Sequence, residues 1–243
     1  MSGGSGASPL LPADSVRRLK LPNGLTVLVR RDPSAPVVAI VTHVKAGYFD
    51  ETDDVGGIAH VLEHMYFKGT ATRGVGEISR ATKAAGGFLN AGTIYDQTSY
   101  YTVLPASAFE RGLQIQFDAY AHSLIDAGEL ARELEVIIQE AKRKEDNPSA
   151  VAVETLYELM HDRHRMRRWR IGREEGLRRL TRDDLLNGRK GGRIHRSRDS
   201  RRRLSPRIFQ ISRSVARGFS TQLVKPRPFR ARLHNLYGLT RNF

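Results

Sequence analysis

The order of strands and helices in this sequence predicts an α+β fold, a mainly antiparallel sheet with helices packed on one face. Short β-branched runs open the chain and return after residue 86, whereas helical patterns dominate residues 107–161. The 243 residues and the hydrophobic content of 40% suffice for one packed domain. We therefore expect a single core followed by a tail of different composition.

The expected strands begin after a turn at Leu21-Pro22-Asn23-Gly24, because Asn-Gly favours a tight reversal of the chain. Leu25, Val27 and Val29 then alternate with other residues, which places them on one face of a strand. The β-branched run at residues 37–44 is typical of a buried strand. The four expected strands are residues 25–30, 37–44, 88–93 and 99–104.

Glycines and prolines divide the helical stretches into separate elements. Gly57 precedes the first helix and Gly69 ends it, while Pro148 follows the end of the longest one. Thr181 is an expected N-cap for a short final helix. The expected helices are residues 58–67, 78–85, 107–124, 126–144 (starting at Asp126 or Ala127), 150–161 and 181–186.

The net charge of +14 is confined to the end of the chain. Residues 187–243 hold 16 of the 40 Lys and Arg residues and one acidic residue, Asp199, so residues 1–186 carry a net charge of −1. The basic tail contains no recognised nucleic-acid-binding motif. We expect no specific nucleic-acid partner, and non-specific anion binding by the tail is a weaker alternative.

Three segments follow from these patterns. Residues 1–15 are rich in Gly, Ser, Ala and Pro and are expected to form a disordered leader without a secretory signal. The body follows, and from residue 188 the Arg-rich tail shows no period of 2 or 3.6. We interpret residues 188–243 as disordered, frameshifted or otherwise non-native to the fold. No run approaches the roughly 18 apolar residues of a membrane span, so we expect a soluble, cytoplasmic protein.

The run His60-Val61-Leu62-Glu63-His64 predicts a metal site in the helix expected at residues 58–67. At about 100° per residue, His64 lies roughly 40° from His60, and Glu63 lies roughly 60° on the other side. Two imidazoles one turn apart can bind one Zn²⁺, with the carboxylate near the ion but not on it. This H-x-x-E-H order is that of the inverzincins, whose Glu is the expected general base. A chance cluster of surface residues is the alternative.

A third ligand must be His, Asp or Glu, because the chain has no cysteine. In the helix expected at residues 126–144, Glu133 and Glu140 border the apolar stripe and should point into a groove. Seven residues span about 10.5 Å along a helix, whereas Zn–O bonds are about 2.0–2.2 Å. One glutamate should therefore bind the ion and the other support the site, unless both are ordinary solvated side chains. The stripe itself consists of Leu130, Leu134, Ile137 and Ala141.

Residues 60–70 resemble the pitrilysin/insulysin family of zinc endopeptidases, particularly its mitochondrial-processing-peptidase-like branch. The similarity covers about residues 16–187, and the 76 residues between His64 and Glu140 fit the spacing of the family. Further matching segments are residues 21–27, 44–51, 86–93, 133–140, 170–172 and 181–186.

The resemblance implies a single half-domain, with residues 16–187 as the N-terminal catalytic domain. Glu63 would be the catalytic base, and Glu133 would support the site without binding the metal itself. Asn90 and Ala91 would line an edge strand that pairs with an extended peptide substrate. A second homologous domain or subunit is the implied partner. The implied ligands of one Zn²⁺ per chain are His60, His64 and Glu140.

The chain departs from the family pattern after Asn187. The aromatic segment, the Pro-Asn turn and the β-branched strand that the family carries there are replaced by the Arg-rich tail. We predict a zinc-dependent endopeptidase that uses metal-activated water and a glutamate base, with activity impaired where the second half is lacking. The alternative is a non-catalytic or defective partner subunit of a two-subunit peptidase.

Overall fold

The structure, a computed structural model, describes residues 16–189. The expected leader at residues 1–15 and almost all of the expected tail lie outside the described residues. Within residues 16–189, no helix is both long and apolar enough to cross a membrane.

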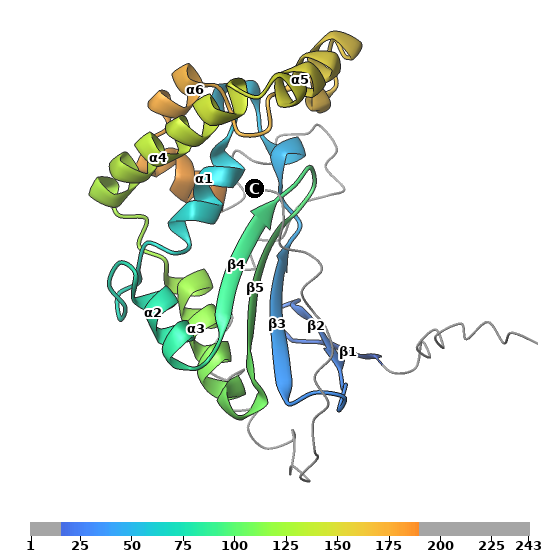
Figure 1. Cartoon of the computed structure of the whole chain (residues 1–243), viewed down its shortest axis with the longest axis vertical. Helices are drawn as coiled ribbons and strands as arrows, with labels where there is room; N and C mark the ends of the chain where they lie inside the picture. The colour runs from blue at the N-terminus through green and yellow to red at the C-terminus, as the bar shows by residue number, and fades with distance from the viewer. Residues whose placement is uncertain (1–15, 190–243) are drawn as a thin grey trace, which may run out of the picture.

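The strands form two antiparallel sheets, which confirms the predicted α+β class (Figure 1). A two-stranded hairpin pairs β1 with β2, and a three-stranded sheet has the order β3-β5-β4. Val41 lies opposite Tyr101 in one ladder of that sheet, and Asn90 lies opposite the same Tyr101 in the other. The strands are β1 (Val16–Lys20), β2 (Thr26–Arg30), β3 (Val37–Val44), β4 (Phe88–Thr93) and β5 (Thr98–Pro105).

The predicted turn at Asn23-Gly24 joins the hairpin. The Gly24 N–H donates to the Leu21 carbonyl at 2.8 Å, and Gly24 adopts a φ of +88° that glycine tolerates without strain. The Asn23 side chain accepts a hydrogen bond from the Leu25 N–H at 3.0 Å. Strand β1 was not predicted, because all five of its residues are exposed and its sequence, VRRLK, lacks alternation.

The expectation that residues 37–44 form a buried strand is wrong in one respect. Strand β3 has the expected bounds, but its residues alternate between exposed and half-buried. Three helices pack on one face of the sheet: α3 (Phe109–His122) lies against β3 and β5, and α1 (Ile58–Met65) and α2 (Glu77–Ala84) lie against β4. Val41, on the opposite face, is accordingly 60% exposed.

The predicted helices are present within a few residues of their expected bounds. Helix α6 was not predicted, because its six residues include Gly176 and are too few to show a period. Short 3₁₀ turns precede α1 and α3 and follow α5. The helices are α1 (Ile58–Met65), α2 (Glu77–Ala84), α3 (Phe109–His122), α4 (Ala127–Glu145), α5 (Pro148–Met160), α6 (Glu174–Arg179) and α7 (Arg182–Arg189).

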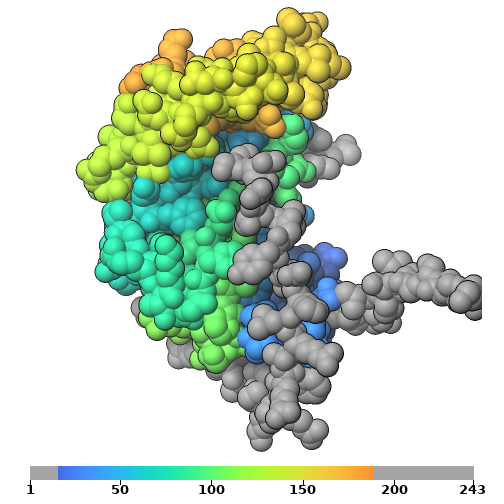
Figure 2. Space-filling model, in the orientation of Figure 1, coloured from blue at the N-terminus to red at the C-terminus, as the bar shows by residue number. Residues whose placement is uncertain are grey.

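Helix α1 is held on several sides. Its apolar residues pack with Ile137 of α4 and Leu185 of α7 in a core whose members are almost fully buried. It also contacts β4, so it is fixed between the long helix and the edge of the sheet (Figure 1). Figure 2 shows the yellow-green surface of α4 and α5 directly above the cyan surface that includes α1. A side chain on α1 can therefore meet partners from both α4 and β4.

Candidate metal centre

The start of α1 is fixed by a buried carboxyl group. Glu51, 3% exposed, accepts hydrogen bonds at 2.9 Å from the backbone N–H groups of Gly57 and Ala59. These bonds satisfy donors that have no partner within the helix. Gly57 has a φ of +93°, and a Cβ there would lie 2.6 Å from the Ile171 carbonyl oxygen, so glycine is required. The first turn, which carries His60, is thus held in place.

His60 and His64 lie one turn apart on α1 with their rings in contact. The ring centroids are 4.5 Å apart, and the two Nε2 atoms are 3.2 Å apart. Two nitrogens bound tetrahedrally to one Zn²⁺ would be separated by about 3.3 Å, given Zn–N bonds of about 2.0–2.1 Å. The pair therefore has the spacing of two ligands to a single ion.

His60 is in the form that binds a metal. Burial, with smaller contributions from the charges of His64 and Lys144, lowers the pKa of His60 to about 3. The imidazole is therefore neutral near pH 7, as coordination requires. Its Nδ1 atom is buried without a hydrogen-bond partner among the described residues.

Glu140 approaches the histidine pair from α4. Its carboxylate oxygens lie 4.0 Å from His60 Nε2 and 3.8 Å from His64 Nε2. One donor atom from each of the three residues lies within 4.8 Å of the others. The structure thus brings the three predicted zinc-binding residues together, and a shift of roughly 0.5 Å by the half-exposed Glu140 would give tetrahedral spacing. The donor set of two imidazoles and a carboxylate suits zinc.

Glu133 lies behind His64 and away from the cluster. Its Oε1 atom is 2.8 Å from His64 Nδ1, and its Oε2 atom forms an ion pair with Lys68. Burial opposes ionisation, but the hydrogen bonds from His64 and Lys68 prevail, so the pKa of Glu133 lies below its usual value. The ionised carboxylate accepts the Nδ1 proton, which leaves the His64 Nε2 lone pair directed toward the cluster.

The side chain of Glu63, a residue of α1, reaches the edge strand β4. It is 8% exposed, and burial raises the pKa of its carboxyl group. Its Oε2 atom accepts a hydrogen bond from the hydroxyl group of Thr93, at the end of β4. Thr93 in turn lies 3.2 Å from the Thr98 hydroxyl, which donates to the Ala46 carbonyl at 2.9 Å. This arrangement fixes one carboxylate oxygen of Glu63.

Asn90 and Ala91 lie on β4, an edge of its sheet. Among the strands of residues 16–189, β4 is hydrogen-bonded to β5 alone. Asn90 is exposed, whereas Ala91 packs on the cluster around Tyr100 on the other face. The two residues are therefore neighbours on the edge strand, and their side chains point to opposite faces of the sheet.

Sequence reasoning missed the residues that support the cluster: Glu51, Lys68 and Thr93. Glu51 precedes the Gly-Gly start of α1, which is a weak signal for a capping acid. Lys68 and Thr93 act across the tertiary structure and carry no local signal.

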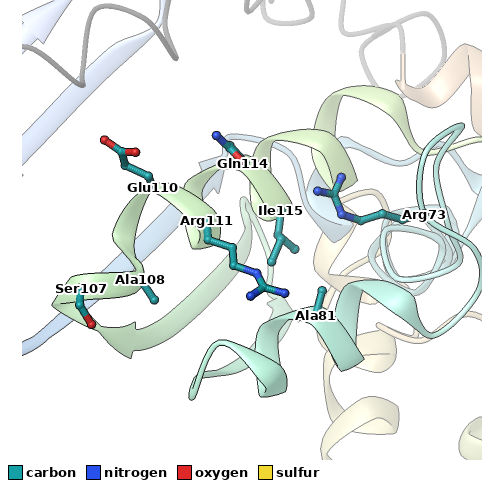
Figure 3. A pocket seen from close by; sticks show the side chains of 8 residues that line it. All are labelled: Arg73, Ala81, Ser107, Ala108, Glu110, Arg111, Gln114 and Ile115. Atoms are coloured by element: carbon teal, nitrogen blue, oxygen red, sulfur yellow. The ribbon is translucent and has the colours of Figure 1, made fainter.

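A separate cavity of about 650 Å³ between α2 and α3 contains none of the residues of the metal cluster (Figure 3). Arg73, Arg111 and Ile115 are among its lining residues.

Comparison with known proteins agrees with this geometry. The sequence profile of Insulinase (Peptidase family M16) matches residues 26–172. The uncharacterized zinc protease YmxG of Bacillus subtilis is 32% identical over 170 residues, which are 70% of this chain and 42% of that protein. The probable mitochondrial-processing peptidase subunit beta of Arabidopsis thaliana is 32% identical over 178 residues, 73% of this chain and 34% of that protein.

The fold is similar to that of a protease from Helicobacter pylori, with a TM-score of 0.70 and 23% identity. That match covers 72% of this chain and 42% of the other. The chain therefore spans about two-fifths or less of the length of these matched proteins.

Proposed function

The chain belongs to the insulinase family of peptidases, family M16, and from this premise we propose that it is the metal-binding part of a zinc-dependent endopeptidase. The observation that carries the proposal is the convergence of His60, His64 and Glu140, whose donor atoms lie within 4.8 Å of one another. Three protein ligands and an open fourth position are the arrangement of a catalytic zinc site.

His60, His64 and Glu140 would hold one Zn²⁺. When bound, the ion lowers the pKa of a water molecule toward 7 and polarises the scissile carbonyl. Glu133 supports this site by holding the tautomer of His64, because the Nδ1 proton is engaged at 2.8 Å. His64 thus needs no change of tautomer before its Nε2 atom binds the ion.

Glu63 would act as the general base. Its carboxylate accepts the proton of the attacking water and then donates it to the leaving amine. Burial raises the pKa of Glu63, which makes its carboxylate a stronger base than a solvated one. Thr93 fixes one oxygen of Glu63, and the other would take the proton.

An extended peptide would pair with the free edge of β4 by β-augmentation. Alternate residues of β4 turn their backbone N–H and C=O groups to the free edge, so one residue of the Asn90–Ala91 pair would form backbone hydrogen bonds with the peptide and the other would bond to β5. Strand β4 ends at Thr93, whose hydroxyl contacts Glu63. A peptide aligned along β4 would therefore pass beside the proposed base.

Residues 16–187 would form the catalytic domain, and a second homologous domain or subunit would cover the peptide. The alternative is a non-catalytic or defective partner subunit of a two-subunit peptidase. We retain the cytoplasmic location and the absence of a specific nucleic-acid partner as predictions.

The decisive experiment measures zinc content and the cleavage of a mixed peptide pool by the full chain and by Glu63→Gln. We expect the parent to hold one zinc and cleave peptides, and the variant to keep zinc but lose cleavage. A variant that cleaves like the parent would show that Glu63 is not the base. A parent that binds zinc without cleaving, alone and with added partner, would favour the non-catalytic alternative.

A further inference from the structure

Lys68 connects to the proposed metal site through two successive polar contacts. Its ammonium group forms an ion pair with Oε2 of Glu133, whose Oε1 atom lies 2.8 Å from His64 Nδ1. Each oxygen of the Glu133 carboxylate thus has its own donor. The carboxylate bridges a cation and an imidazole that come from the same part of the chain.

The surroundings of Glu133 require such a cation. The Glu133 side chain is 8% exposed, and a buried carboxylate without a counter-charge is strongly unfavourable. Among the described residues, the basic side chain that forms an ion pair with Glu133 is that of Lys68. The Lys68 ammonium group supplies a positive charge beside one carboxylate oxygen of Glu133, and the His64 ring lies beside the other.

The backbone around Lys68 gives it a fixed position relative to the histidines. The Lys68 N–H donates to the carbonyl of Met65, the last residue of α1, at 3.2 Å. Gly69 then reverses the chain with a φ of +105°. The Lys68 backbone is therefore held just beyond the end of α1, the helix that carries His64, and the Glu133 carboxylate of α4 contacts both side chains.

We propose that Lys68 is a positioning residue for the zinc site, acting through Glu133 on His64; this inference rests on the proposed function. By holding the Glu133 carboxylate in place, Lys68 orients the His64 ring and increases the affinity of Nε2 for the metal. Removal of a partner behind a metal-binding histidine typically weakens metal binding by about 10- to 100-fold. Lys68 itself does not contact the ion or the reacting atoms.

The test is the zinc dissociation constant of the full chain, measured by competition with a chromophoric chelator. We expect Lys68→Gln to bind zinc about tenfold or more weakly, and Lys68→Arg to remain close to the parent because it keeps the charge. Lys142→Gln is the matched control, since Lys142 is a half-exposed lysine that pairs with Glu174 on the surface. Its zinc affinity should equal that of the parent.

A double-mutant cycle separates a positioning role from a general structural effect. In a Glu133→Gln background, Lys68→Gln should cause no further loss of zinc affinity, because its route to His64 is already cut. If Lys68→Gln does not fold, the zinc affinity of Glu133→Gln is compared with that of the double variant, since neither leaves a buried carboxylate unpaired. A further loss of affinity in the double variant would overturn the inference.

Two results would overturn the inference while the parent binds zinc normally: an unchanged affinity in Lys68→Gln, or an equal loss in both backgrounds. A parent that binds no zinc would instead overturn the proposed function, and the inference with it.

Discussion

The hydroxyl group of Thr93 donates a hydrogen bond to the carboxylate of Glu63, and this contact joins the edge strand β4 to the metal-binding helix α1. The two residues are 30 positions apart in the sequence. The Thr93 hydroxyl oxygen also lies 3.2 Å from that of Thr98, whose hydroxyl group donates to the Ala46 carbonyl. The orientation of the proposed base therefore depends on the strand proposed to bind the peptide.

Replacement of Thr93 by valine should lower kcat/KM by roughly 10- to 100-fold, the factor expected for a lost hydrogen bond to a charged group of about 1.5–3 kcal/mol. Thr93→Ser keeps the hydroxyl and should retain most of the activity. Steady-state kinetics on one peptide, together with zinc analysis, checks the prediction. A Thr93→Val protein with reduced zinc content would instead place Thr93 in the metal site.

Replacement of Glu140 by glutamine should remove stoichiometric zinc, because an amide oxygen is a far weaker zinc ligand than a carboxylate. Glu145→Gln, an exposed residue near the end of the same helix, is the control and should keep the metal. The measurement is elemental analysis after dialysis against a weak chelator. Full zinc occupancy in Glu140→Gln would refute its assignment as a ligand.

The metal cluster could be predicted because its parts follow local periodicity. The spacing of His60 and His64 places them on one helix face whatever the surroundings are, and the apolar stripe of α4 places Glu133 and Glu140 at its border. Helical geometry alone left open which glutamate lies beside the metal-binding nitrogens and which lies behind a histidine. The structure resolves this through packing, since α4 crosses α1 so that Glu133 meets Nδ1 of His64 and Glu140 lies near Nε2.

Other features depend on contacts that no local pattern reveals. Lys68 and Thr93 reach their partners only when α1, α4 and β4 are assembled. Strand β1 forms because the turn at Asn23-Gly24 returns the chain on itself, although its own residues show no strand pattern. Strand β3 has one exposed face, and the β-branched run that predicted burial indicates strand propensity without specifying how many faces are covered.

Replacement of Ile138 by alanine should destabilise the protein by about 2–5 kcal/mol, because Ile138 is fully buried in the core shared by α1 and α4. Val136→Ala, at a position 49% exposed on the same helix, should change the free energy of unfolding by less than about 0.5 kcal/mol. Urea denaturation followed by circular dichroism measures both. Equal effects in the two variants would contradict the packing of α4 on α1.

The buried Glu51 predicts that stability falls as the pH rises. Burial, opposed by the N–H groups of Gly57 and Ala59, raises the pKa of Glu51 from 4.5 to about 8. Between these values the folded chain holds a proton that the unfolded chain has released. This stabilisation is complete below pH 4.5 and is lost as the pH rises through 8, with a slope of at most about 1.4 kcal/mol per pH unit.

Glu51→Gln cannot ionise, so its free energy of unfolding should decline less than that of the parent between pH 5 and pH 8. Chelator-treated protein is used for urea denaturation at each pH, so that proton release on metal binding does not contribute. Parallel pH curves for the parent and the variant would show that Glu51 is ionised throughout, with the helix N-terminus compensating its charge more strongly than burial opposes it.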